Sequence, residues 1–140
     1  MVGGTPSRLV GPMTAQHRIV APPELPDPSG YAHAVVAAPG RVVYLGGQTG
    51  AGETLAAQFD AAAAALVTAL RAAGGEPDDL VSLVVFTTDM EGYRASLREL
   101  GEVWRRHFGR WYPAMALIGA SALFEPEALV ELTGVAVVPE

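Results

Sequence analysis

The stretch 129–138, LVELTGVAVV, constrains the fold most strongly. Alternate residues of a β-strand share one face of the sheet, so Val130, Leu132 and every second residue after them form a wholly apolar or glycine face. The opposite face carries a single carboxylate, Glu131, followed by Thr133. A buried carboxylate that lacks a donor, a cation or a proton is costly. We therefore expect an internal strand, with a hydrogen-bonding partner, a water or a ligand at Glu131.

The rest of the chain alternates between strand and helix patterns. The predicted elements, in order, are strands at 31–38 and 41–47, a helix at 55–73, a strand at 80–87, a helix at 93–108 and two strands within 111–138. Pro39 and Gly40 separate the first two strands and indicate a hairpin. The order ββαβαββ predicts an α+β fold with one mixed sheet and two helices on one face. Other subunits are expected to cover the second, apolar face.

The N-terminal part of the chain shows no such periodicity. Residues 1–16 are rich in Gly, Pro, Ser and Thr, which predicts a flexible extension, and residues 17–140 are predicted to form a single domain. Within that domain, four prolines in 21–30 predict a rigid irregular arm before order begins at Tyr31.

Composition excludes several kinds of chemistry. The net charge of −6 and the absence of lysine disfavour a nucleic-acid backbone binder and exclude a Schiff-base or P-loop lysine. With no cysteine there is no disulfide, thiolate nucleophile or Cys-bound zinc. No apolar run is long enough to span a membrane, and no secretory signal is recognisable, so we expect a cytoplasmic protein without membrane contact.

The histidine and glycine patterns do not by themselves identify a functional site. His17, His33 and His107 lack metal-ligand spacing, so no metal and no cofactor are expected. The glycine-rich segment 45–52, LGGQTGAG, matches neither nucleotide-binding pattern. It is either a plain turn or a strand end whose backbone N–H groups bind an oxygen atom.

Six separated segments resemble one known family when taken in order. They are YAHAV, LGGQTG, AAQFDAAAAAL with Gln58, VVFTTDM, YPA and EPEALVEL. Together, from Tyr31 to Val138, they are similar to the Rid (YjgF-like) family. The resemblance implies a chorismate-mutase-like fold, a homotrimer with small-molecule sites in the clefts between subunits, and cofactor-independent hydrolysis of reactive imines and enamines such as 2-iminopropanoate and 2-aminoacrylate.

The same resemblance implies roles for particular residues. Glu131 matches the family's acid that holds or activates the attacking water, whereas a second acid of that motif is Thr133 here. Other positions matching the cleft of the family are Tyr31, Gly46, Gly47 and Gln48.

One departure from the family changes the expected substrate. Family deaminases read PARS where this chain reads PAMA, so Met115 and Ala116 replace a carboxylate-binding arginine and a small polar residue. A thioether supplies neither the charge nor the paired donors of a guanidinium. Arg41 and Arg110 are candidate substitutes for this arginine, because they lie near the matching segments in the sequence. In the second helix, Gly101 replaces a cleft asparagine of the family.

Two functions therefore follow from the sequence. The first is an enzyme that processes an imine, enamine or related carbonyl compound but is not a conventional 2-iminopropanoate deaminase. Glu131 is its catalytic residue, and Tyr31, Gly46, Gly47, Gln48, Met115 and Ala116 bind substrate. The alternative is a non-catalytic, metabolite-binding or partner-regulating trimer. A ribonuclease is disfavoured by the acidic charge balance.

Overall fold

The computed structural model describes residues 16–140, and its elements follow the predicted order closely. Nearly all of the predicted extension at 1–16 lies outside the described residues. The elements are β1 (Arg18–Val20), β2 (Ala34–Val36), β3 (Arg41–Gln48), α1 (Leu55–Ala72), the short 3₁₀ helix η1 (Pro77–Asp79), β4 (Leu80–Thr87), α2 (Met90–Ala95), α3 (Leu97–Phe108), β5 (Ala114–Gly119) and β6 (Val130–Val138).

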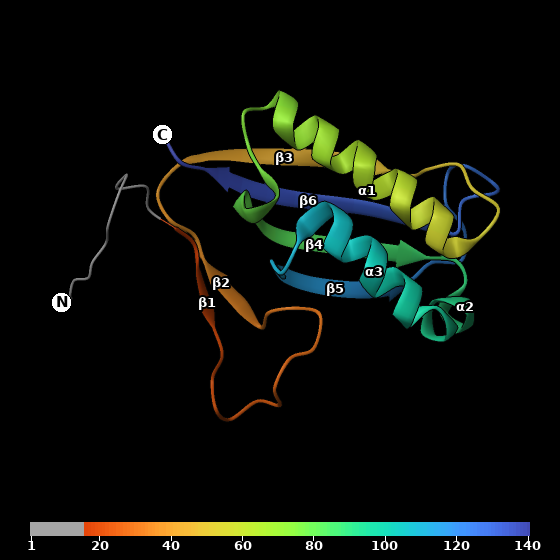
Figure 1. The fold of residues 1–140 in the computed structure, drawn as a ribbon, viewed down its shortest axis with the longest axis horizontal. Helices are drawn as coiled ribbons and strands as arrows, with labels where there is room; N and C mark the ends of the chain where they lie inside the picture. The colour runs from red at the N-terminus through yellow and green to blue at the C-terminus, as the bar shows by residue number, and fades with distance from the viewer. Residues whose placement is uncertain (1–15) are drawn as a thin grey trace.

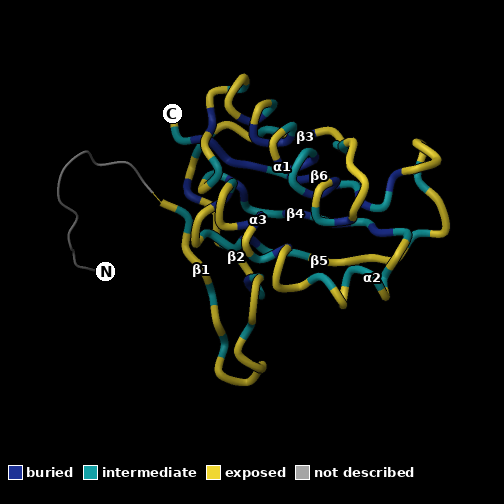
Figure 2. The backbone as a smooth tube through the Cα atoms, turned by 45° about the vertical axis from the view of Figure 1, so that its right-hand side comes forward, coloured by how far each residue is buried: buried dark blue, intermediate teal, exposed yellow. Residues whose placement is uncertain are grey.

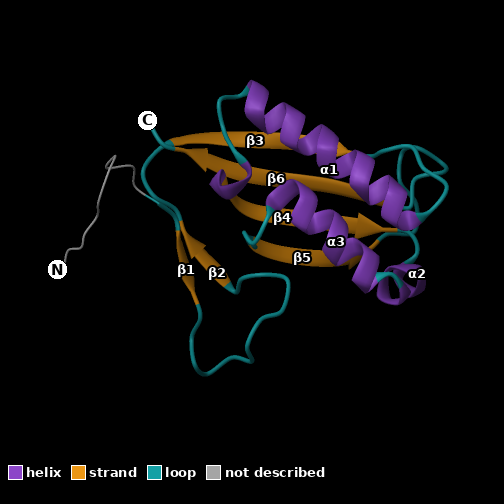
Figure 3. Cartoon of the chain, viewed as in Figure 1, coloured by secondary structure: helices purple, strands orange, loops and turns teal. Residues whose placement is uncertain are grey.

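The main sheet has four strands in the order β3-β6-β4-β5 (Figures 1 and 3). The strands β4 and β5 are parallel, whereas β6 is antiparallel to both of its neighbours. The predicted mixed sheet is thus confirmed, and the stretch around Glu131 is an internal strand. The apolar face predicted for β6 is fully buried, from Val130 to Val138.

The helices α1 and α3 lie on one face of this sheet, as predicted (Figure 1). The core between them is built from side chains such as Phe59, Leu66, Leu70 and Leu132, and it is the dark region of the tube in Figure 2. By length and composition alone α1 could cross a membrane, but its apolar side chains form this core. The Thr54 hydroxyl caps its first turn by accepting from Ala57 N–H at 3.1 Å.

The predicted first hairpin is wrong. β2 pairs with β1 in a separate two-stranded ribbon that projects from the body (Figure 1). Order therefore begins before Tyr31, at β1, whereas the arm at 21–30 is irregular as predicted. His17 ties this ribbon to the sheet, because its Nδ1 accepts from Ala38 N–H and its Nε2–H donates to Val137 C=O, both at 2.9 Å. A Cβ at Gly40 would overlap the Val138 carbonyl, so glycine lets the chain cross closely beside β6.

The helix predicted at 93–108 is two helices that meet at Ser96. The Asp89 side chain caps α2 by accepting from Gly92 N–H at 2.9 Å. The Ser96 hydroxyl donates to Gly92 C=O at 2.8 Å, and this local bond competes with continuous helical bonding. Tyr93 consequently belongs to α2 rather than to the long helix.

Among residues 16–140, no helix lies over the second face of the sheet (Figure 1). Tyr44 and Val42 on β3 are 80% and 51% exposed, and Ile118 on β5 is 44% exposed. Glu131 lies on this face, opposite Phe86 of β4, and is half-buried. We call this surface the open face.

Candidate functional site

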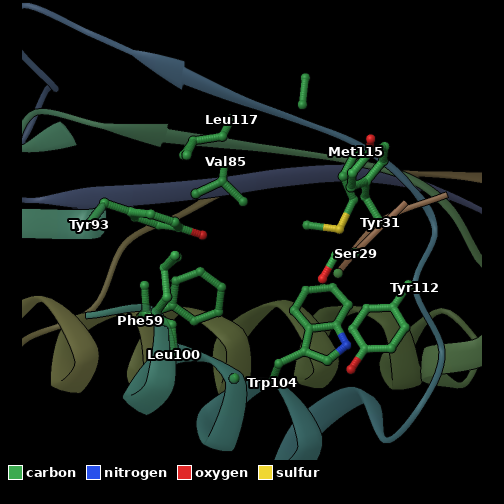
Figure 4. Close-up of a pocket in the computed structure, with 14 residues that line it drawn as sticks. Ser29, Tyr31, Phe59, Val85, Tyr93, Leu100, Trp104, Tyr112, Met115 and Leu117 are labelled. Carbon is green, nitrogen blue, oxygen red and sulfur yellow. The ribbon is translucent and has the colours of Figure 1, made fainter. Parts of the chain in front are cut away.

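A cavity of about 600 Å³ lies between β5 and the helices, at the edge of the sheet (Figure 4). Its walls come from the loop that precedes β2, from α1, α2 and α3, and from β4 and β5. Five aromatic side chains line it: Tyr31, Phe59, Tyr93, Trp104 and Tyr112. Its volume is in the range of sites that hold small organic molecules.

Tyr31 reaches the cavity because its segment is fastened along the edge of β5. Ala32 N–H donates to Pro113 C=O at 2.9 Å, and Ala32 forms an isolated parallel bridge with Ala114. The Tyr31 and His33 rings meet edge to face with centroids 5.3 Å apart, and His33 Nε2–H donates to Pro26 C=O at 2.7 Å. These contacts hold the loop over the cavity.

The opposite wall is a rigid aromatic pair. The rings of Trp104 and Tyr112 are stacked with centroids 5.6 Å apart and planes 7° apart. Trp104 Nε1–H donates to Trp111 C=O at 3.0 Å, so its indole offers the cavity only ring surface. Side-chain contacts and this hydrogen bond leave Trp104 little freedom to move.

Met115 and Ala116 both line the cavity, as does Tyr31. Among the described residues, however, no charged side chain lines it. Neither proposed substitute arginine does so: Arg110 is exposed before β5, and Arg41 pairs with Val138 at the far end of the sheet.

Gly46, Gly47, Gln48 and Glu131 form a second group at the other end of β3. The register of β3 against β6 shifts between Leu45 and Gln48, so a bulge contains the two glycines. A Cβ at Gly47 would overlap the Glu131 carboxylate, which therefore lies directly over the glycine. In the part of the chain that the structure describes, no side chain forms an ion pair with Glu131.

The two groups do not meet within one chain. Met115 pairs with Leu83, and Leu83 pairs with Gly134, three residues along β6 from Glu131. Strand spacing and rise therefore separate Glu131 from Met115 by about 10 Å across the sheet and about 10 Å along it. Glu131 also points to the open face, whereas Met115 points to the helices. A cleft containing both groups needs residues from two chains.

Two contributors were missed as site residues. In the sequence, Gln58 stands out only as part of the resemblance. The structure shows that its side chain is 6% exposed and that its Oε1 accepts a hydrogen bond from Leu129 N–H at 2.7 Å. This hydrogen bond positions the start of β6. Tyr93 was assigned to a helical apolar stripe, yet its hydroxyl points into the cavity (Figure 4). Burial raises the pKa of the Tyr93 hydroxyl, which therefore stays protonated. The signal for Tyr93 in the sequence is its hydroxyl, a polar group on an otherwise apolar helix face.

The family model for endoribonuclease L-PSP matches residues 24–138 of this chain. The protein belongs to the Rid/YjgF family. A Rid protein of unknown function from Yersinia pestis has 29% identity and a TM-score of 0.78, with 89% of this chain and 100% of that chain covered. A YjgF/YER057c/UK114 family member from Mycobacterium tuberculosis has 35% identity and a TM-score of 0.62, covering 78% and 87%.

Other relatives of this Rid protein carry different functional names. A putative endoribonuclease from Thermotoga maritima shares 26% identity with a TM-score of 0.61, with 86% of this chain and 96% of that chain covered. A probable translation initiation inhibitor from Rhodopseudomonas palustris shares 26% identity with a TM-score of 0.62, covering 89% and 100%. A comparison with curated proteins finds no match. These relatives thus share the family and the fold of this chain under different functional names.

Between residues 16 and 140 no three His, Asp or Glu side chains are grouped as metal ligands. His107 instead donates from Nε2 to Asp60 Oδ1 at 2.6 Å and joins α3 to α1.

Proposed function

We propose that this Rid protein is a homotrimer whose intersubunit clefts bind and hydrolyse an uncharged imine, enamine or related carbonyl compound in the cytoplasm. The observation that carries the proposal is the aromatic cavity at Tyr31, Met115 and Ala116, which has no charged side chain in its lining among the described residues. A carboxylate in such a cavity would lose its hydration without gaining a cation. A conventional 2-iminopropanoate deaminase is therefore disfavoured.

The proposed cleft combines two chains. The cavity of one chain supplies Tyr31 and Met115, and the open face of a neighbour supplies Glu131, because one chain holds these groups on opposite faces of its sheet. Tyr31 closes the cleft, and the backbone N–H groups of Gly47 and Gln48 donate to developing negative charge.

The proposed reaction is addition of water to a C=N bond. Glu131 accepts a proton as the water oxygen attacks the imine carbon, and it returns that proton to the nitrogen. The hydroxyl proton of the resulting carbinolamine passes to its nitrogen as the C–N bond breaks, which leaves a carbonyl and ammonia. An enamine first gains a proton on carbon and loses one from nitrogen to become the imine. The sequence consumes one water and needs no cofactor.

Two substrates that differ in one charge test this function. Freshly generated 2-iminopropanamide is expected to release ammonia faster with this protein than 2-iminopropanoate does, and Met115→Arg is expected to reverse that order. Glu131→Gln should lower turnover at least about 100-fold, the usual effect of losing a general base. Ammonia release above the buffer rate is the measurement.

The control is Glu102→Gln, the same chemical change at an exposed position of α3, which should leave turnover unchanged. Retained turnover in Glu131→Gln would remove the proposed role of that carboxylate. A wild-type preference for the carboxylate substrate would overturn the expected selectivity.

A second candidate function is binding without catalysis. It is favoured by one observation: among residues 16–140 of a single chain, the only ionisable groups that line the cavity are the tyrosines. A trimer of this kind would sense a metabolite or regulate a partner protein. Ligand binding without ammonia release from either imine supports this candidate over the enzyme.

A nucleic-acid function is not proposed, although some relatives are named as ribonucleases. The chain has a net charge of −6 and no lysine. Binding to a phosphate backbone depends on clustered positive charge.

A further inference from the structure

The chemistry of the cavity wall narrows the class of ligand. Rings and aliphatic side chains form most of the lining, with Trp104 stacked on Tyr112 and Met115 beside them (Figure 4). Flat rigid walls of this kind favour flat ligands, because ring stacking adds to the gain from burying apolar area. A thioether also makes favourable contacts with aromatic rings.

Among the hydroxyls of the cavity lining, that of Tyr93 points into the cavity (Figure 4). Tyr93 projects from α2, and its oxygen points between Val85 and Phe59 (Figure 4). No group of the described residues forms a hydrogen bond with it. Burial keeps this hydroxyl protonated, since it raises the pKa of Tyr93. Tyr93 is half-buried. A ligand that covers its hydroxyl favours having an acceptor there, because a donor left unpaired on burial is costly.

The guanidinium of Arg105 lies near one wall of the cavity. Gly101 lines the cavity, and Arg105 Nη1 is 3.7 Å from the position that a Cβ on Gly101 would occupy. The arginine itself is exposed and does not line the cavity. Arg105 is therefore a control for an anionic ligand that reaches this guanidinium.

We propose, on the basis of the small-molecule role proposed above for this cavity, that its ligand is an uncharged flat aromatic compound with one hydrogen-bond acceptor. The aromatic body lies between Met115 and the Trp104–Tyr112 pair. The acceptor takes the hydrogen bond of the Tyr93 hydroxyl.

Three naphthalenes of nearly equal shape test the ligand class. They are 2-acetylnaphthalene, which is neutral with an acceptor, 2-isopropylnaphthalene, which lacks the acceptor, and 2-naphthoate, which is anionic. Calorimetric titration of the full chain is expected to show binding of the ketone about fivefold tighter than the hydrocarbon, the usual contribution of one neutral hydrogen bond. Binding of 2-naphthoate should be at least about tenfold weaker than that of the ketone.

Variants assign the effect to particular residues. Tyr93→Phe keeps the ring and should abolish the advantage of the ketone while leaving the hydrocarbon unchanged. Met115→Arg should make 2-naphthoate the tightest ligand of the three, and it provides an independent test if Tyr93→Phe fails to fold. Arg105→Gln should leave all three affinities unchanged.

Several outcomes would overturn the inference. Tightest binding of 2-naphthoate to the natural protein, lost in Arg105→Gln, would show an anionic ligand. Equal binding of ketone and hydrocarbon would remove the role of Tyr93. No binding of any naphthalene, combined with ammonia release from 2-iminopropanamide, would reject the aromatic ligand and leave the proposed function standing.

Discussion

Gln58 uses both ends of its side-chain amide to join loops that are distant in the sequence. Its Nε2 donates to Gly52 C=O at 3.1 Å and to Glu127 C=O at 3.2 Å, while its Oε1 accepts from Leu129 N–H. These bonds connect α1 to the loop after β3 and to the loop before β6. They fix the backbone two residues before Glu131, and Gln58 is therefore a positioning residue.

Replacing Gln58 with leucine should destabilise the protein. Gln58→Leu keeps the volume but leaves Leu129 N–H and two carbonyls without their partners, so we expect the free energy of unfolding to fall by about 2–3 kcal/mol. Urea unfolding measures this change. Gln16→Leu is the control, because Gln16 is exposed, and it should change stability by less than about 0.5 kcal/mol. Equal effects of the two substitutions would contradict the structural role.

At the scale of elements, an ion-pair cluster joins the two helices that cover the sheet. Asp60 on α1 accepts from His107 Nε2–H, and Arg106 Nη2 lies 3.4 Å from its second oxygen. The hydrogen bond from His107 is the main reason that the pKa of Asp60 lies below its usual value, with Arg106 adding to it. Partial exposure of Asp60 limits the energy involved.

This cluster should make the packing of α1 on α3 sensitive to acid. A lowered pKa in the folded protein means that the unfolded chain binds the proton more readily. The stabilisation is present above the ordinary aspartate pKa of 3.8, and it is lost as the pH falls through the lower folded value. Asp60→Asn should therefore cost less than about 1 kcal/mol at pH 7 and still less at pH 3.

Urea unfolding of Asp60→Asn and wild type at pH 7, 5, 4 and 3 measures that convergence. Asp27→Asn, at an exposed loop position, is the matched control and should track the wild type throughout. A difference between Asp60→Asn and wild type that grows on acidification would contradict the assignment.

For the whole molecule, the two faces of the sheet have different environments. One face lies under α1 and α3 and contains the core, whereas the open face presents Tyr44 and Val42 to solvent in the isolated chain. A monomer rarely leaves so many large apolar groups together on one surface. The open face is therefore the surface on which the proposed trimer would form.

A charge on the open face should prevent assembly. Tyr44→Arg places a cation where 80% of the tyrosine is exposed in the isolated chain, so folding should be retained while association is lost. Analytical ultracentrifugation should give three times the chain mass of 14.6 kDa for the wild type and the single-chain mass for the variant. The Glu102→Arg variant, which changes an exposed residue of α3, should still assemble into the trimer. A monomeric wild type would contradict the trimer.

Much of this fold could be predicted from local patterns. The spacing of Leu55, Phe59 and Leu66 is that of one helix face, and the run 80–87 is a strand with the predicted bounds. Alternation assigned Glu131 to the face opposite Val130 and Leu132. Such patterns work because the geometry of a single element decides which of its own side chains share a side.

Pairing between elements depended on the tertiary structure. The partner of β2 is β1 rather than β3, because Gly40 lets the chain leave the ribbon beside Val138 and His17 fastens the ribbon to β6. The break at Ser96 depends on where its hydroxyl finds an acceptor. Neither feature leaves a periodic signal in the sequence.

The candidate site, like the fold, depends partly on local sequence and partly on tertiary structure. The sequence by itself determined the family, the apolar replacement at Met115 and the carboxylate at Glu131, because residue identity and alternation are local properties. Only the tertiary structure decided that Met115 faces an aromatic cavity with the Tyr93 hydroxyl, while Glu131 lies over Gly47 on the open face. Strand order and register set those positions, and they arise from contacts between residues that are far apart in the chain.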